Sequence, residues 1–365
     1  MRSARAIFSG PSAACMSKTL FLASTPLHLF FSLGLMQGAF RGQAHTLALI
    51  DQRPGDREPL ADALQSAAPG PSVVRFPTLR SLGSARAVLE QITDFTRALA
   101  PSTILVGNDR RTEFYAALRG HPSARRAYID DGLYSYLPRH VPEPAWSRRL
   151  SSWRRSRKFA LELERPAAVG GSQAVQDAYV LLPQRVHAGL RDKRVQALEP
   201  AWFADAWVRE VCRAAADAAG FDVARCTSIG LLLLLPHPRF LSADPSLKGR
   251  LEALAAAYAE QAQPVAIKAH PSAADTPLQE QLRIPAGVVE VPARLPVEVL
   301  VPLLSGTLVV GTLTTALLTL ALLGDRVRVR SLPPGAVTAS SSYDRKAFEI
   351  YRAVGIEMLG EEAAA

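Results

Sequence analysis

The sequence predicts an α/β protein with two Rossmann-like αβα domains that face each other across a cleft. Two observations support this fold class: short apolar runs alternate with helical stretches through residues 18–130, and the alternation restarts at residue 230. The length agrees, because 365 residues are too many for one compact core and fit two domains of ordinary size. Hydrophobic residues make up 48% and charged residues 21%, which is typical of a globular chain.

The first half of the chain is predicted to form a parallel sheet. Strands are expected at 18–24, 45–53, 73–77, 102–109 and 126–130, and helices between them at 26–40, 57–67, 84–100 and 113–120. Ligands gather at the carboxyl ends of the strands in such sheets. Polar residues stand at these ends and predict one polar rim, made of Ser24, Thr25, Asp51, Asn108, Asp109, Asp130, Asp131 and Gly132. His28, in the first helix, and His237 are further candidates for the cleft.

The second half repeats the pattern after a less regular middle with a strand at 178–186. Apolar stretches at 230–240, 264–272, 288–293, 307–315 and 325–332 predict strands with their exit loops, and 250–261 and 297–306 predict helices. We therefore expect four parts: a disordered extension or misassigned start at 1–15, an N-terminal acceptor-side domain at 16–200, a connecting helix at 201–224, and a C-terminal nucleotide-binding domain at 225–365.

The charge balance indicates an anionic partner. The net charge is +9, and residues 147–158 gather Arg148, Arg149, Arg154, Arg155, Arg157 and Lys158 around Trp153. This segment is either a solvated face or a patch that rests on anionic lipid headgroups, with Trp146 and Trp153 at the interface. No RRM or zinc-finger signature accompanies it, so we do not expect nucleic acid as a partner.

Several other classes of protein are disfavoured. The three cysteines lie far apart without a CxxC pair, which argues against a disulfide framework or a thiolate zinc site. No run reaches about 18 uninterrupted apolar residues, and the apolar part of 1–15 is too short for a signal peptide. Neither a Walker A nor a GxGxxG sequence is present, which argues against an ATPase or an NAD enzyme.

The pair Asp130-Asp131 before Gly132 is the first candidate for chemistry. A turn needs only one Asp and one Gly, so the second carboxylate requires another explanation. Adjacent side chains on an extended chain point to opposite faces, so one Asp can face the cleft as a general base while the other orients its neighbours. No DxD sequence accompanies the pair, and metal binding is not the favoured interpretation.

Two further stretches suit a phosphate. Lys268 and His270 share one side of a strand end, where a charge and a hydrogen-bond donor could meet an anion; the alternative is a capped strand with a surface histidine. In 308–324 a strand reaches Gly311, and Thr314 and Thr315, with their backbone N–H groups, follow at the expected start of a helix. A helix N-terminus with hydroxyls binds phosphate, although a simple N-cap has the same composition.

Taken in order, these stretches resemble bacterial sialyltransferases, above all the lipooligosaccharide sialyltransferases and polysialyltransferases of the glycosyltransferase family 52 type, which have the glycosyltransferase B (GT-B) fold. Those enzymes share an acidic-acidic-Gly motif, an HP motif and a paired Ser/Thr motif, which Asp130-Asp131-Gly132, His270-Pro271 and Thr314-Thr315 reproduce in that order. The similarity covers most of residues 17–325. It departs from the family in having Thr-Thr where Ser is common, and Ser272 where a basic residue often follows HP.

The resemblance implies an inverting transferase that uses a CMP-activated acidic sugar and needs no metal or other cofactor. Asp131 would be the base and Asp130 would support its loop; His270 would donate to the leaving phosphate with Lys268 nearby, and Glu298 would bond the nucleoside. Pro271, Gly311, Thr314 and Thr315 would complete the donor site. A glycolipid or capsular glycan would be the acceptor. The protein would be cytoplasmic or peripheral on the inner face of the bacterial inner membrane. Whether it forms a homodimer stays open.

Three alternatives stay open from the sequence. The donor could be CMP-Kdo or a CMP-activated legionaminic or pseudaminic acid, because the motifs touch the shared CMP. Another GT-B enzyme could use a UDP or GDP sugar. A non-catalytic protein that binds acidic glycans or anionic membranes would use the basic segment, would not bind CMP, and would associate in a strongly salt-dependent way.

Overall fold

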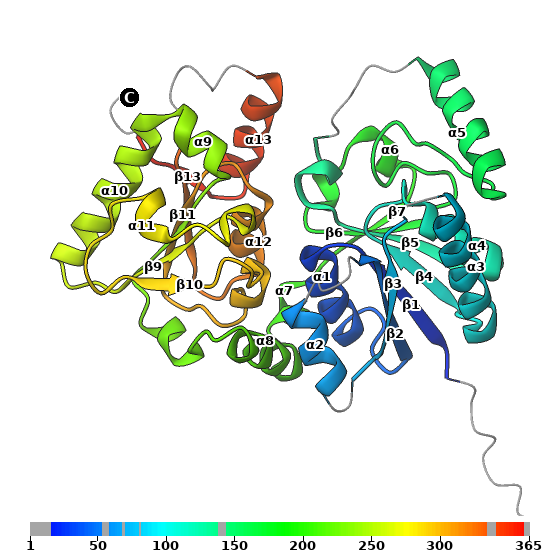
Figure 1. Ribbon diagram of the computed structural model, residues 1–365, viewed down its shortest axis with the longest axis horizontal. Coiled ribbons are helices and arrows are strands. Elements are labelled where there is room, and N and C mark those ends of the chain that lie inside the picture. The colour runs from blue at the N-terminus through cyan, green and yellow to red at the C-terminus, as the bar shows by residue number, and fades with distance from the viewer. Residues whose placement is uncertain are drawn as a thin grey trace, which may run out of the picture.

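The computed structural model describes residues 16–52, 58–67, 70–79, 82–137, 144–333 and 341–360. In these ranges the chain forms two parallel sheets, which lie in two lobes side by side in Figure 1. The α/β class predicted from the sequence is confirmed. The extension expected at 1–15 lies outside the described residues.

The first sheet has seven strands in the order β3-β2-β1-β4-β5-β6-β7. Its central strands are apolar and buried on both faces, as expected for a parallel sheet covered by helices. The strand order reverses between β1 and β4, and the crevice at such a reversal is the usual ligand position. The strands are β1 Lys18–Ala23, β2 Ala44–Gln52, β3 Ser72–Pro77, β4 Thr103–Val106, β5 Arg125–Ile129, β6 Asp177–Val180 and β7 Arg194–Ala197.

The helices of the first domain begin where the sequence supplies capping residues. Thr25 accepts the His28 N–H through its side chain, and Pro26 occupies the first turn of α1, where a missing N–H costs nothing. The helical segments are α1 Pro26–Gln37, α2 Pro59–Ser66, α3 Leu82–Leu99, α4 Thr112–Gly120, η1 Gly132–Ser135, α5 Ala145–Phe159, η2 Pro183–Arg185 and α6 Ala188–Arg191.

The second sheet has six strands in the order β10-β9-β8-β11-β12-β13, so it reverses between β8 and β11. Its strands are β8 Leu231–Leu234, β9 Val265–Lys268, β10 Val289–Val291, β11 Leu308–Gly311, β12 Arg328–Ser331 and β13 Glu357–Met358. Its helical segments are α9 Pro238–Ala243, α10 Pro245–Glu260, η4 Pro271–Ala273, α11 Leu278–Gln281, η5 Val297–Leu300, α12 Thr315–Leu323 and α13 Ser342–Ala353. α12 is apolar on nearly all sides and is mostly buried, as that composition requires.

The segment between the sheets is not the single helix expected at 201–224. It contains α7 Pro200–Phe203, α8 Ala206–Ala218 and η3 Val223–Thr227. The break falls at Asp205, whose carboxylate accepts the Trp207 N–H at 2.9 Å and so starts a new helix. The strand expected at 178–186 ends early, at Val180, and the helix expected at 297–306 is only the short turn η5.

The two domains meet along the helices next to their strand-order reversals. α12 packs on η1 and α7, while α1 and α8 pack on η5. The carboxyl end of β1 therefore faces the ends of β9 and β11 across a cleft. Within the described residues, no helix has both the length and the apolar character that crossing a bilayer requires.

Candidate active site

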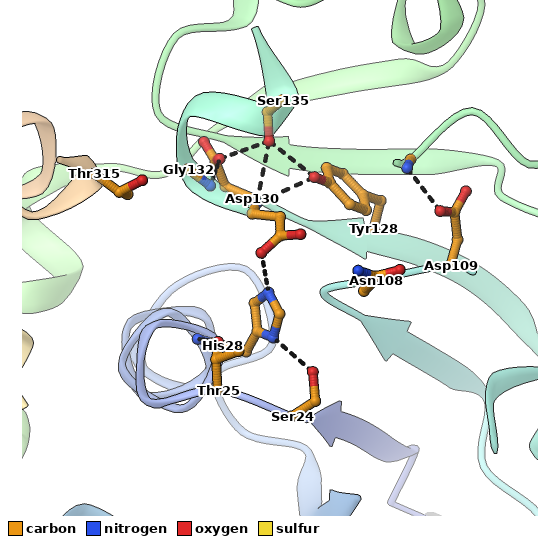
Figure 2. Close-up of polar contacts among 12 residues, drawn as sticks. Ser24, Thr25, His28, Asn108, Asp109, Tyr128, Asp130, Gly132, Ser135 and Thr315 are labelled. Carbon is orange, nitrogen blue, oxygen red and sulfur yellow. Dashed lines mark hydrogen bonds and ion pairs between the residues drawn. The ribbon is translucent and has the colours of Figure 1, made fainter. Parts of the chain in front are cut away.

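The carboxylate of Asp131 is held by a histidine from another part of the first domain. His28 Nε2 lies 3.1 Å from Asp131 Oδ1, and the His28 ring is 1% exposed while the Asp131 side chain is 15% exposed. An ionised carboxylate only accepts hydrogen bonds, so Nε2 carries the proton and donates it. His28 Nδ1 then accepts from the Ser24 hydroxyl at 3.3 Å, and Figure 2 shows the ring between Ser24 and the loop that carries Asp130.

Asp130 is buried beneath the Asp-Asp-Gly turn and bonds its backbone and side chains. The carboxyl group is fully buried and accepts the Gly132 N–H at 2.8 Å, the Ser135 hydroxyl at 2.7 Å, the Leu181 N–H at 2.8 Å and the Tyr136 hydroxyl. Burial raises the pKa of Asp130 to about 6, although these donors oppose the shift. Asp130 therefore fixes the turn from inside, while Asp131 stays partly exposed on the other face.

Two glycines give the site its close fit. A Cβ on Gly107 would lie 2.1 Å from the His28 ring, so only glycine leaves room for this imidazole beside β4. Gly132 has a φ of 65° and faces Thr315 of the second domain, where a Cβ would lie 2.2 Å from the threonine methyl. The Leu133 N–H points to Thr315 Oγ1 at 3.4 Å, which brings the Asp-Asp-Gly loop against the start of α12.

The threonine pair has more structural contacts than expected. Thr314 Oγ1 lies 3.4 Å from the Ala316 N–H as the N-cap of α12. The Thr314 N–H donates to Tyr351 OH at 2.8 Å, and that hydroxyl donates to the Thr314 carbonyl. We expected the backbone N–H groups of both threonines to be available to a phosphate. That expectation is wrong for Thr314, because Tyr351 of α13 already pairs with this N–H.

The His270 imidazole is oriented by the residue that departs from the family pattern. His270 Nδ1 accepts the Ser272 N–H at 3.1 Å and lies 2.7 Å from Ser272 Oγ. Because Nδ1 is an acceptor, the proton of the neutral ring is on Nε2. Burial, the neighbouring His237 and Lys268 all lower the pKa of His270, so the ring is a neutral N–H donor.

A second histidine repeats this arrangement at the end of the adjacent strand. His237 follows β8 as His270 follows β9, and each stands before a proline that begins a short helical segment. His237 Nδ1 accepts the Arg239 N–H at 3.2 Å, so its Nε2 also carries the proton in the neutral ring. The two ring centroids are 5.1 Å apart. His237 therefore belongs to the cleft, as the sequence predicted.

Lys268 and Glu298 are an opposite-charge pair on the floor of the cleft. The Lys268 ammonium donates to the Ala293 carbonyl at 2.9 Å, and the residue is 5% exposed. Burial lowers the pKa of Lys268 to about 8, while Glu298 opposes the shift. Burial likewise raises the pKa of Glu298, and Lys268 and His28 counteract this.

The cleft has a volume of about 480 Å³, which suits a nucleotide-sized ligand. It takes residues from both domains and brings together most of the predicted donor-site residues. Its polar lining includes Thr25, His237, Lys268, His270, Glu298, Thr312, Thr314 and Thr315, with Pro271 beside them. Within the described part of the chain, no group of three or more His, Cys, Asp and Glu side chains could hold a metal ion.

Neither the Ser24–His28–Asp131 chain of contacts nor Asp130 and Gly132 belongs to this lining, and four more predicted rim or site residues have structural contacts instead. Asp109 is fully buried and accepts hydrogen bonds from the N–H groups of Gly170 and Ser172. This strand-end carboxylate therefore anchors the loop that contains these two residues. Asn108 Oδ1 accepts the Arg110 N–H at 3.1 Å within a turn, while Asp51 pairs with Arg111. Gly311 packs against Leu234 of the neighbouring strand, and a Cβ added at Gly311 would lie only 3.2 Å from the Leu234 Cβ.

The sequence analysis missed residues that complete the site. Gly107, Ser135, Tyr136 and Tyr351 hold the two loops, but none belongs to one of the three motifs. Gly107 follows an apolar strand directly, and this was the one signal that could have identified it. The two tyrosines carry no local signal, because their partners come from tertiary packing.

Solved structures share this fold at low sequence identity. An alpha/beta-galactoside alpha-2,3-sialyltransferase from Photobacterium phosphoreum is 10% identical, with a TM-score of 0.57 over 95% of this chain and 100% of that one. UGT89C1 of Arabidopsis thaliana, complexed with UDP-L-rhamnose, is 11% identical, with a TM-score of 0.53 over 95% of this chain and 85% of that one. A UDP-GlcNAc 2-epimerase from Methanocaldococcus jannaschii is 13% identical, with a TM-score of 0.50 over 92% of each chain.

These likenesses establish the fold. The protein has two Rossmann-like domains in the GT-B arrangement, which confirms the architecture predicted from the sequence. A bacterial sialyltransferase is among the structures that share it, in agreement with the resemblance of the motifs. No family profile and no curated protein matches the sequence.

Proposed function

We propose that the protein is an inverting glycosyltransferase that moves sialic acid, or a related acidic ulosonic sugar, from its CMP-activated form to a hydroxyl of a cell-surface glycan. One observation carries the proposal: the Asp131 loop lies against the start of α12, beside a cleft that also holds His270. In this proposal Asp131 is the base and the cleft residues form the phosphate site; Asp131 lies beside the residues that line the cleft and is not one of them. The GT-B fold and the order of the three motifs support the same activity.

The reaction is a direct displacement. Asp131 takes the proton of the acceptor hydroxyl, and the oxygen attacks the anomeric carbon of the donor sugar. The bond from that carbon to the CMP phosphate oxygen breaks, and its electron pair leaves with CMP, so the configuration inverts. His28 holds the Asp131 carboxylate in place during this step.

The second domain stabilises the leaving phosphate. Negative charge grows on that phosphate in the transition state, where fixed donors are most effective. His270 supplies an Nε2–H, Lys268 a positive charge, and the threonines the N-terminal end of α12. His237 adds a second N–H donor for the anionic part of the donor. In this scheme no metal takes part, so we expect chelation by EDTA to leave the rate unchanged.

Release of CMP from CMP-sialic acid in the presence of galactoside acceptors tests the proposal. We expect turnover by the native protein and none by Asp131→Ala, while both bind CMP equally. CMP-Kdo and CMP-activated legionaminic and pseudaminic acids belong in the same assay, because the cleft residues named above contact the shared CMP. Absence of turnover with every CMP-sugar, together with turnover of a UDP or GDP sugar, would overturn the proposal. Absence of both turnover and nucleotide binding would favour the non-catalytic alternative.

A further inference from the structure

Helix α5 presents three large apolar residues to solvent, while its serines are only partly exposed. The exposed positions of Ala145–Phe159 include Trp146, Leu150 and Trp153, which are 69%, 39% and 54% exposed. Their spacing of four and three residues places them on one stripe of the helix. The four serines of the helix (Ser147, Ser151, Ser152 and Ser156) are all only partly exposed and lie on the other side. Three large apolar side chains thus lie on the outer face, where a surface helix usually carries polar residues.

This orientation is fixed by contacts on the inner side. Arg155 donates to Thr112 Oγ1 at 2.8 Å, the Leu163 N–H donates to Ser156 Oγ at 2.9 Å, and Phe159 packs against the core. Arg86 of α3 donates two hydrogen bonds to the Lys158 carbonyl. In Figure 1 α5 lies at the outer edge of the first domain beside α3 and α4, remote from the second domain. The apolar stripe therefore faces away from the body.

Basic residues flank the stripe on both sides. Arg149 lies on one side of the stripe, Arg154 and Lys158 lie on the other, and all three are exposed. The Arg157 guanidinium lies 5.1 Å from the centre of the Trp153 ring, within the stripe itself. Residues 144–161 contain no acidic residue. Exposed aromatic rings between cations, without a single carboxylate, match the boundary between headgroups and acyl chains of an anionic bilayer.

We infer that the outer face of α5 is a membrane-docking surface for bilayers that contain anionic phospholipids. Trp146, Leu150 and Trp153 enter the headgroup boundary, while Arg149, Arg154, Arg157 and Lys158 meet lipid phosphates. The docked domain is the one that carries Asp131, so docking would hold the domain with the proposed base at the membrane that presents lipid-linked acceptors. Only that last consequence rests on the proposed function.

Co-sedimentation of the full chain with vesicles tests the inference. Phosphatidylcholine vesicles with and without phosphatidylglycerol are compared at low and high salt, with tryptophan emission as a second readout. We expect binding only to vesicles with phosphatidylglycerol, accompanied by a blue shift of the emission. The triple variant Trp146→Ser, Leu150→Ser, Trp153→Ser should lose the binding that persists at high salt. The triple variant Arg149→Gln, Arg154→Gln, Lys158→Gln should bind about fivefold more weakly per residue removed.

A charge-matched control separates this surface from the general basicity of the chain. Arg97, Arg213 and Arg225 are exposed and pair with acidic residues one turn away. Their triple replacement by Gln removes the same charge and should leave vesicle binding near the native level. The inference is overturned if native protein does not bind phosphatidylglycerol vesicles, or if the control weakens binding as much as the α5 variants. Full competition by soluble polyphosphate without any emission shift would also overturn it, since it indicates a polyanion site. Vesicle binding is measured without sugar transfer, so its failure is distinct from failure of the proposed activity.

Discussion

The His28 imidazole and the Asp131 carboxylate share a 3.1 Å hydrogen bond, although 103 positions separate the two residues in the chain. α1 and the loop after β5 supply one partner each, so the first sheet itself sets the geometry of the proposed base. Ser24 at the end of β1 completes the chain of contacts by bonding the other ring nitrogen.

Two replacements of His28 distinguish a role in positioning the Asp131 carboxylate from a role in packing alone. His28→Gln keeps an N–H donor for Asp131, whereas His28→Leu removes it, and we expect kcat to fall about tenfold or more only with Leu. Steady-state kinetics measures this difference, and equal kcat values for the two variants would show that His28 only fills space.

Asp130 should control stability and its pH dependence. In Asp130→Asn an amide NH₂ faces at least one of the donors Gly132 N–H and Leu181 N–H, which costs about 1–3 kcal/mol of unfolding free energy. The pKa of Asp130 is raised to about 6 from an ordinary value of 3.8. The native state thus binds this proton more tightly than the unfolded chain does, so the stabilisation is present at low pH and is lost as the pH rises through about 6.

Urea unfolding at several pH values measures both effects. The stability difference between the native protein and Asp130→Asn should change between pH 5 and pH 7.5 in the direction just given. A difference that is the same at both pH values would mean that Asp130 keeps one protonation state throughout.

The Ser272 contacts predict a graded effect on donor use. His270→Ala removes the Nε2–H donor and should lower kcat/KM by about tenfold or more, since hydrogen bonds to charged groups contribute ~1.5–3 kcal/mol. Ser272→Ala removes only the hydroxyl contact and leaves the Ser272 N–H on Nδ1, so its loss should be smaller. Steady-state kinetics with the CMP donor decides this, and a larger loss in Ser272→Ala would contradict the assigned orientation.

The lowered pKa of Lys268 predicts how the affinity for CMP depends on pH. Its pKa is lowered to about 8, so the ammonium is charged below that pH and becomes neutral above it. CMP stays a dianion above pH of about 7, because its second phosphate pKa is about 6. Calorimetry should therefore show affinity that begins to fall between pH 7 and pH 8 and falls further at higher pH. Lys268→Met should bind more weakly at pH 7 and show no such fall; a parallel fall in both would assign it to another group.

The fold could be predicted because the central strands of both sheets are strongly apolar and helical stretches lie between them. LLLL at β8 and LVVG at β11 are buried along their whole length. Two strands that were missed lie at sheet edges: β7 is polar and only partly buried, and β13 has two residues. Neither has a periodicity long enough to stand out from a loop.

The site could be predicted only as far as its motifs. Asp131, His270 and Thr315 stand at strand or helix ends, where function and local sequence coincide. Asp109 has the same local setting, yet the N–H groups of Gly170 and Ser172, more than 60 residues away, bury it as an anchor. The partner of a strand-end carboxylate is chosen by tertiary packing, and the sequence carries no local record of that choice.

Nucleotide selectivity in a thermal-shift experiment tests the central claim most directly. CMP, UDP, GDP and ADP are added at equal concentration to the native protein and to His270→Ala, since only a ligand of the folded state raises Tm. We predict the largest rise with CMP for the native protein and a much smaller rise for His270→Ala. A rise with UDP equal to or above that with CMP, or a CMP response unchanged in His270→Ala, would contradict the assignment of this cleft to a CMP-sugar.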